Sequence, residues 1–139
     1  MKYILLLPIV LFLHIVDDFH LQGILANMKQ RKWWTNQATG NLVSRDKFMK
    51  KYGNDYKICL LFHAFSWSFT ISIPYLILIY INLTKNGVIF YLTQLFINTL
   101  IHAYIDDLKA NKFKINLIQD QIAHLLQIIL TFIIFYKNT

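Results

Sequence analysis

The fold of this chain is decided by residues 58–83, which read ICLLFHAFSWSFTISIPYLILIYINL. This run exceeds the roughly 20 apolar residues that a helix needs to cross the hydrocarbon core of a bilayer. The runs 88–105 and 115–136 have the same character, and an earlier run, 4–16, is shorter. The first run reaches spanning length only if its helix continues through the aspartates at 17 and 18 to about residue 27. The sequence therefore predicts an all-α integral membrane protein built as a four-helix bundle.

The composition agrees with a protein that lies in a membrane. Of the 139 residues, 56% are hydrophobic and only 15% are charged, whereas soluble domains carry about 25% charged residues. This length allows one domain. We therefore expect a single integral membrane domain over residues 1–139, with spans at about 3–27, 58–83, 88–108 and 115–136. The one cysteine, Cys59, excludes an internal disulfide.

The basic residues are distributed unevenly between the two sides of the predicted spans. Loop 29–57 carries eight lysines and arginines and the third loop carries three, whereas the N-terminus, the second loop and the C-terminus carry one each. The positive-inside rule then predicts a multi-pass protein of the bacterial inner (plasma) membrane with both termini on the non-cytoplasmic side. Because no small-residue cleavage site follows the first apolar run, we expect no cleaved signal peptide.

The basic cytoplasmic loop 29–57 contains a predicted amphipathic segment. Residues 46–52 are expected to form a short helix that is capped by Ser44 and ended by Gly53. Trp33 and Trp34 stand beside basic residues, which is typical of the headgroup level of a membrane. We expect this helix to lie on the inner leaflet over the polar residues of the spans. The alternative is a solvated connector held by anionic lipid.

Histidines and aspartates stand at helical spacing inside the apolar runs. Three pairs lie four residues apart, which places both members on one helix face, and a further histidine lies in the second run. The pairs are His14 with Asp18, His102 with Asp106, and Asp120 with His124, and the further imidazole is His63. An ionisable group inside a membrane persists when it is paired, bound to an ion or facing water. Since the predicted topology brings all seven groups to a similar depth, we predict that they are the ligands of a metal centre.

The residue types of this set indicate the metal and its chemistry. Imidazoles with carboxylates suit Zn most, and Mn, Fe or Ni as well. Seven ligands are enough for one or two divalent ions with open positions, where bound water can ionise and attack an ester. The aspartates expected to serve catalysis, as ligands or general base, are Asp17, Asp18, Asp106 and Asp120. Side chains expected to orient the ligands through hydrogen bonds are Gln22, Asn98, Asp107 and Gln121. Basic residues expected to attract an anionic substrate are Arg31, Lys32, Lys109 and Lys112.

The order of these motifs resembles a family of small phage and bacterial membrane proteins known as domain of unknown function 3307. The family pattern is His-x3-Asp-x3-Gln, a histidine that opens the second span, His-x3-Asp-x2-Lys, and Asp-Gln-x2-His. This chain shows it at residues 14–22, 63, 102–109 and 120–124, with doubled aspartates at 17–18 and 106–107 and a longer basic loop as departures. The family is distantly similar to inner-membrane proteins described as metal-dependent hydrolases. The family has no settled activity, so the resemblance favours a hydrolase by analogy only, and it is compatible with a phage or prophage origin.

These patterns favour a membrane-embedded, metal-dependent hydrolase at the cytoplasmic face. Its substrate would be a phosphoester or a similar amphiphilic anion, either a phosphate-containing small molecule or a lipid headgroup. Membrane lipid is the expected partner, a homodimer is compatible with the small size, and no base-reading module predicts specific nucleic-acid binding. Three alternatives remain. The histidines and aspartates of the spans could transport metal ions or protons. The protein could instead be a non-enzymatic phage membrane effector with a structural metal. The His–Asp pairs could also simply join helices through hydrogen bonds.

Overall fold

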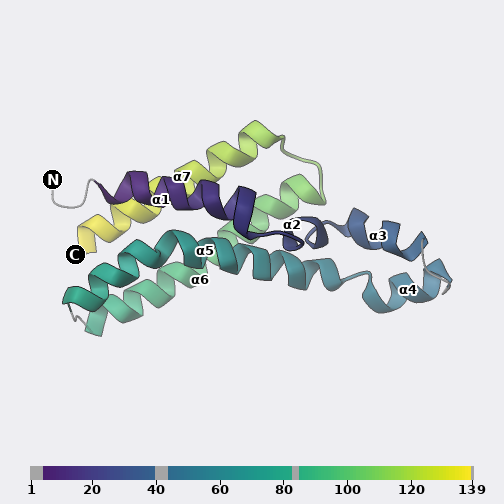
Figure 1. The fold of residues 1–139 in the computed structure, drawn as a ribbon, viewed down its shortest axis with the longest axis horizontal. Coiled ribbons are helices and arrows are strands. Elements are labelled where there is room, and N and C mark those ends of the chain that lie inside the picture. Colours follow the sequence, from purple (N-terminus) through teal and green to yellow (C-terminus); the bar gives the residue numbers. More distant parts are fainter. Residues whose placement is uncertain (1–4, 40–43, 83–84, 139) are drawn as a thin grey trace.

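The computed structural model describes residues 5–39, 44–82 and 85–138, and these residues form helices and no strand (Figure 1). The elements are α1 (Leu6–Val16), the π-helix η1 (Asp17–Leu21), α2 (Leu25–Met28), α3 (Arg31–Thr39), α4 (Arg45–Tyr52), α5 (Asp55–Asn82), α6 (Lys85–Ala110) and α7 (Leu117–Asn138). The prediction of an all-α protein is therefore confirmed.

Three of these helices, α5, α6 and α7, are long and apolar enough to cross a membrane. The predicted spans 58–83, 88–108 and 115–136 fall on them, apart from residue 83, which lies outside the described residues, and residues 115–116, which precede α7. Their outward faces carry large apolar side chains, such as Phe62, Phe96 and Leu130, that are more than half exposed. Soluble monomers rarely expose apolar surface of this extent, so these faces are suited to lipid.

The first predicted span differs from the structure. Residues 3 and 4 of the predicted span 3–27 lie outside the described residues. Over the rest of it, instead of one helix, α1 passes into η1, the chain then turns at residues 22–24, and α2 is a single turn. Gly23 makes the turn with a φ of +45°, a conformation that glycine adopts without steric cost. The 11 residues of α1 and 5 of η1 span roughly 24 Å at about 1.5 Å per residue, which is short of the roughly 30 Å of hydrocarbon.

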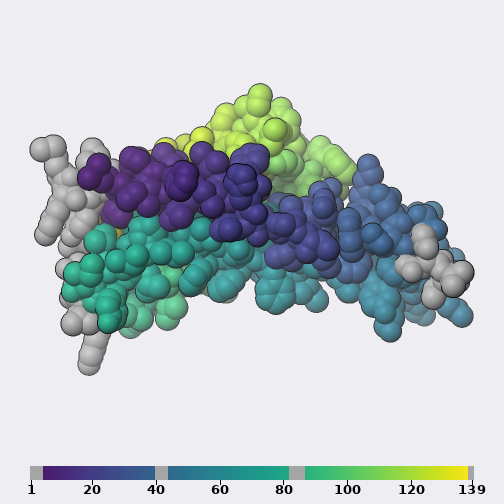
Figure 2. All heavy atoms as spheres, in the orientation of Figure 1, coloured from purple at the N-terminus to yellow at the C-terminus, as the bar shows by residue number. Residues whose placement is uncertain are grey.

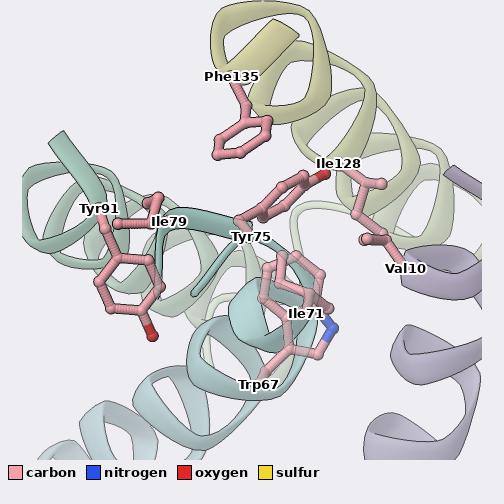
Figure 3. Close-up of a cluster of buried hydrophobic side chains, with 8 residues drawn as sticks. All are labelled: Val10, Trp67, Ile71, Tyr75, Ile79, Tyr91, Ile128 and Phe135. Atoms are coloured by element: carbon pink, nitrogen blue, oxygen red, sulfur yellow. The ribbon is translucent and has the colours of Figure 1, made fainter. Parts of the chain in front are cut away.

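Four segments surround a common core. Helix α5 packs against α1 and α6, and α7 packs against α6 and α1; α1 and α7 run side by side over α5 and α6 in Figure 1. Side chains four residues apart on α5 form one inward stripe, which supplies half of the apolar core. The buried core residues are Val10, Trp67, Ile71, Tyr75, Ile79, Tyr91, Ile128 and Phe135 (Figure 3). His63 continues the same stripe toward the other end of the helix, so one helix face serves both the core and the polar residues.

The basic loop is a helical hairpin rather than a loop with one short helix. Helices α3 and α4 pack against each other. Helix α4 matches the predicted helix, and Ser44 and Gly53 hold the expected cap positions, but the Ser44 side chain makes no capping hydrogen bond. Along the long axis of the molecule, the hairpin lies beyond the turn between α6 and α7 (Figures 1 and 2). The expected position of α4 over the polar residues is therefore wrong, because α3 carries the chain outward before it returns.

Asn111, just past the end of α6, fixes the junction between α2 and α3. The backbone N–H of Arg31 donates to Asn111 Oδ1 at 2.8 Å, and Asn111 Nδ2 donates to the carbonyl of Lys29 at 3.2 Å. The indole of Trp34 adds a hydrogen bond to the carbonyl of Met28 at 2.8 Å. The entry of the hairpin is thereby held against the end of α6 at the level of the polar residues.

The turn at Gly23 generates a stability prediction. A Cβ atom at this position would meet nothing within 4 Å, so Gly23→Ala introduces no clash. It should lower the free energy of unfolding by roughly 1–2 kcal/mol, because an L-residue is strained in the left-handed region. The apparent melting temperature in detergent should fall by roughly 3–6 °C. Gly23→Asn is the matched control and should fall less, because asparagine tolerates this conformation. Equal apparent melting temperatures of wild type and the alanine variant would contradict the left-handed conformation of Gly23.

Candidate metal centre

The buried imidazoles and carboxylates gather at one end of the helix assembly. His63 comes from α5, His102 and Asp106 from α6, and Asp120 and His124 from α7; each side chain is at most 3% exposed. The i, i+4 spacing on α6 and α7 places both members of each pair on one inward face. Because α6 ends and α7 begins at the same end of the assembly, the two pairs face each other.

Two groups of three candidate ligands form here. His102, Asp106 and His124 each offer a ligand atom within 4.8 Å of the others, and so do Asp18, His63 and His102. His102 belongs to both groups, and Asp18 is the half-buried member. All but two of the seven predicted ligands are members of these groups; the two others are His14 and Asp120.

Asp106 is the centre of the arrangement. Its Oδ2 lies 2.7 Å from His63 Nε2, and its Oδ1 lies 3.3 Å from His124 Nε2. The imidazole of His124 also lies 3.3 Å from Asp120 Oδ1 on its own helix. One carboxylate therefore faces imidazoles from two other helices, with a different oxygen toward each.

Several of these buried atoms have no hydrogen-bond partner within the described part of the chain. They include both ring nitrogens of His102 and Nδ1 of His124. His124 Nε2 and Asp120 Oδ1 also form no hydrogen bond of good geometry, although they lie 3.3 Å from each other. A buried polar atom without a partner costs about 1–3 kcal/mol, and such atoms are few in folded proteins. Their convergence beside Asp106 fits a divalent cation, since neutral imidazole nitrogens and carboxylate oxygens are ligand atoms for Zn, Mn and Fe.

Trp67, which sequence reasoning missed, forms the wall against which the imidazoles stack. Its ring is fully buried and lies face to face with His102, with ring centroids 4.1 Å apart and planes 19° apart. His102 in turn stacks on His124, with centroids 4.2 Å apart. Stacking holds a ring by its faces and leaves its in-plane nitrogens free to bind. The signal in the sequence was the spacing of His63 and Trp67, which share one face of α5.

His14 lies beside the two groups rather than in them. Its Nδ1 accepts a hydrogen bond of 2.7 Å from the indole Nε1–H of Trp67. A neutral imidazole that accepts at Nδ1 carries its proton on Nε2, which leaves no lone pair for an ion. In this arrangement His14 positions Trp67, and through it the stack of His102 and His124.

Asp17 and Gln22 turn toward α5 rather than to the candidate ligands. The Asp17 carboxylate is fully buried and accepts hydrogen bonds from Thr70 Oγ1 at 2.9 Å, from Ser66 Oγ at 3.3 Å, and from the Gln22 side chain. These donors fill the hydrogen-bonding positions of the carboxylate, so Asp17 connects η1 to α5. A catalytic role for Asp17, and an orienting role for Gln22 on the ligands, are not supported by these contacts.

Gln121 is the predicted orienting residue that does contact candidate ligands. Its side-chain amide donates to Asp18 Oδ2 at 3.3 Å and to Asp120 Oδ2 at 3.2 Å. Asn98 instead accepts hydrogen bonds from Gln127 and Thr131 and so joins α6 to α7 away from the groups.

Asp107 faces away from the candidate ligands. Its carboxylate pairs with Lys112 at 2.8 Å and accepts a hydrogen bond from Asn111 at 3.0 Å. The Asp107 carboxylate raises the pKa of Lys112. The two adjacent aspartates on α6 therefore face opposite sides, because Asp106 points inward and Asp107 points outward.

Two lysines reach the buried carboxylates. Lys109 Nζ lies 2.6 Å from Asp120 Oδ2, as befits a predicted anion-attracting residue near the centre. Lys29, which was not predicted, places its Nζ 2.5 Å from Asp106 Oδ2. No pattern in the sequence distinguishes Lys29 from the other basic residues of its loop. Arg31 and Lys32 are exposed.

A cavity of about 390 Å³ connects the surface to the centre. Its polar lining consists of Asp18, Gln22, Lys29, Gln30, Asp106, Lys109 and Gln121. Its apolar lining includes Phe19, Phe113 and Leu117, whose side chains are more than half exposed. This volume falls in the range of small-molecule sites, and carboxylates of both candidate groups lie on its wall.

No family model, curated protein or solved structure matches this chain. The resemblance to the membrane-protein family therefore rests on the order of its motifs.

The geometry predicts that His102 is required for metal binding and that His20 is not. His20 is exposed on η1 and is the matched control for replacement of a histidine. We expect the purified protein to bind Zn²⁺, His102→Ala to bind it at least about 100-fold more weakly, and Gln121→Ala about 10-fold more weakly. Competition titration with a chelating dye measures all four proteins. Equal loss in the His20→Ala and His102→Ala variants would contradict the site.

Proposed function

We propose that this protein is a membrane-embedded metal-dependent hydrolase that cleaves a phosphoester of an amphiphilic or anionic substrate. The observation that carries the proposal is the meeting of buried, unpartnered imidazole nitrogens with carboxylates beside a cavity that two lysines line. Buried ionisable groups of this density are expected where a membrane protein performs chemistry.

The metal would be held by His102, Asp106 and His124, whose ligand atoms already lie close together. A divalent ion there would supply a water of lowered pKa and would polarise a phosphoryl oxygen. The stack on Trp67 holds the two imidazoles in fixed planes. Such preorganisation lowers the cost of assembling the centre when substrate binds.

The cavity wall would bind and orient the substrate. Lys109 and Lys29 are the cations that a phosphate group would meet there. The half-buried carboxylate of Asp18 lines the same cavity. One of its oxygens can accept a proton from the attacking water, so Asp18 can act as a general base. Gln121 donates to that carboxylate and keeps it oriented.

Features of the surface support a substrate that is partly apolar. The mouth of the cavity carries the exposed side chains of Phe19, Phe113 and Leu117. The faces of α5, α6 and α7 beside it are also apolar. A lipid-like substrate could keep its hydrocarbon part along these faces while its headgroup enters the cavity.

The proposal includes a four-helix arrangement in the inner membrane, with α1 as the fourth, shorter member. Helix α1 packs against α5 and α7, and the uneven distribution of lysine and arginine favours a cytoplasmic position for the basic hairpin. Since the hairpin and the cavity lie at the same end of the long helices, the centre would open toward the cytoplasm. Transport is less favoured, because the buried histidines and aspartates of the described residues do not continue into the opposite half of the assembly, where apolar side chains such as Val10, Ile71 and Ile128 are buried beside hydroxyl and amide groups.

Replacement of Asp106 tests the hydrolase directly. With Zn²⁺ or Mn²⁺ supplied, wild type in detergent should release phosphate from an aryl phosphate or from vesicles that contain phosphatidic acid. Asp106→Asn should lower kcat by about 100-fold or more, ~2.7 kcal/mol of transition-state stabilisation. Asp107→Asn is the matched control, because that carboxylate pairs outward with Lys112, and it should keep wild-type activity. Phosphate release that persists in Asp106→Asn would refute the assignment.

Replacement of the lysines tests the anion site. Lys109→Gln should weaken the binding of inorganic phosphate to the zinc-loaded protein about tenfold, ~1.4 kcal/mol, measured by calorimetric titration. Lys112→Gln should leave the binding unchanged, because its side chain is outside the cavity lining and paired with Asp107. An equal effect of both changes would indicate diffuse attraction by surface charge instead of a site.

A further inference from the structure

Lys29 reaches into the centre and contacts two of the candidate ligands. Its Nζ lies 2.5 Å from His63 Nε2 and 2.5 Å from Asp106 Oδ2. Those two acceptor atoms are themselves 2.7 Å apart. The lysine side chain is only 14% exposed, so its ammonium is enclosed by candidate ligands rather than extended into solvent.

The backbone around Lys29 is held in place. Its N–H donates to the carbonyl of Leu25 at 3.0 Å, which closes the turn of α2. Its carbonyl accepts from Asn111 at 3.2 Å, and Asn111 also binds the N–H of Arg31. The turn at Gly23 directs α2 toward this position. Lys29 is therefore built into the centre by the contacts between α2 and α6, unlike the exposed lysines of the hairpin.

The contact with the Lys29 ammonium prevents His63 from serving as a metal ligand, which affects the group of Asp18, His63 and His102. An ammonium has only hydrogens to offer, so toward Lys29 the Nε2 atom of His63 acts as an acceptor. The 2.7 Å contact between His63 Nε2 and Asp106 Oδ2 is then bridged by the ammonium that both atoms contact, and not by a proton of the ring. The neutral ring then carries its own proton on Nδ1, and no lone pair of His63 remains for an ion. A divalent cation in the group of Asp18, His63 and His102 would also lie within a few ångströms of a positive charge, which is unfavourable in a buried site.

The other candidate group stays available. Asp106 turns Oδ2 toward Lys29 and Oδ1 toward His124, which lies 3.3 Å away. The carboxylate can therefore offer Oδ1 to a metal ion while Oδ2, which also lies 3.7 Å from His102 Nε2, binds the ammonium. Both ring nitrogens of His102 and Nδ1 of His124 have no hydrogen-bond partner among the described residues, and His124 Nε2 has only its 3.3 Å contacts with Asp106 and Asp120.

We propose that the ammonium of Lys29 takes the place of a second metal ion, so that the centre binds one divalent ion through His102, Asp106 and His124. The proposal rests on the metal centre of the proposed function and specifies its composition. Asp106 then bridges one metal ion and one ammonium. A phosphate in the cavity would meet both positive charges, since Lys29 and Asp106 both line it.

The experiment measures zinc stoichiometry on the full chain in detergent, by elemental mass spectrometry after removal of free metal. Wild type should hold one equivalent. Lys29→Met, which keeps most of the length of the side chain and removes its charged end, should hold two. Lys29→Arg should hold one, because the positive charge is retained, and Lys32→Met is the control for loss of an exposed lysine and should also hold one. In Lys29→Met with His63→Ala, the second equivalent should be lost again.

The outcomes separate this inference from the proposed function. Two equivalents in wild type, or one equivalent in both wild type and Lys29→Met, would overturn the role of Lys29 while leaving a metal centre in place. Loss of all zinc in Lys29→Met alone would also overturn it, because the lysine would then support the ion instead of replacing one. Zinc absent from wild type would overturn the proposed metal centre itself, and the inference with it.

Discussion

The structure depends on how one buried carboxylate is neutralised. Asp106 on α6 faces His63 of α5, His124 of α7 and Lys29 beside α2, so a single charge joins four segments. Removing one partner of a buried ion pair typically costs 3–5 kcal/mol, and an uncompensated charge in a membrane interior is costly. The helices are thus held in a register that satisfies Asp106, and the cavity and its lysines follow from that register.

The two halves of the assembly share their helix faces but differ in chemistry. On α5, the stripe that carries Ile71 and Tyr75 into the apolar core continues to Trp67 and His63. Trp67 belongs to both halves, because its ring packs in the core cluster, stacks on His102 and donates to His14. The other half combines apolar packing with hydrogen bonds between helices, such as those of Gln127 and Thr131 to Asn98, and Trp67 connects this packed half to the imidazoles. This division explains how a chain of 139 residues can hold ionisable groups in fixed positions.

Helical periodicity predicted most of the architecture, because long apolar runs and i, i+4 pairs are properties of one helix at a time. The long helices and the convergence of His102, Asp106 and His124 follow from such patterns. The break after η1 was not predictable, since it depends on Asp17 finding donors on α5 while its neighbour Asp18 faces the cavity. Lys29 was missed for a related reason: its contacts are with residues 34 and 77 positions away. Composition identifies a basic loop but does not show which lysine turns inward.

A metal centre of this kind requires that buried imidazoles and carboxylates of the chain bind the ion themselves. X-ray absorption at the zinc edge of the zinc-loaded protein examines this bonding, because the scattering pattern of imidazole is distinct from that of water or sulfur. We predict nitrogen and oxygen ligands at about 2.0–2.1 Å with the outer-shell scattering of two histidine rings, and loss of one ring's contribution in His124→Ala. A spectrum without imidazole scattering, or with sulfur from Cys59, would contradict the claim.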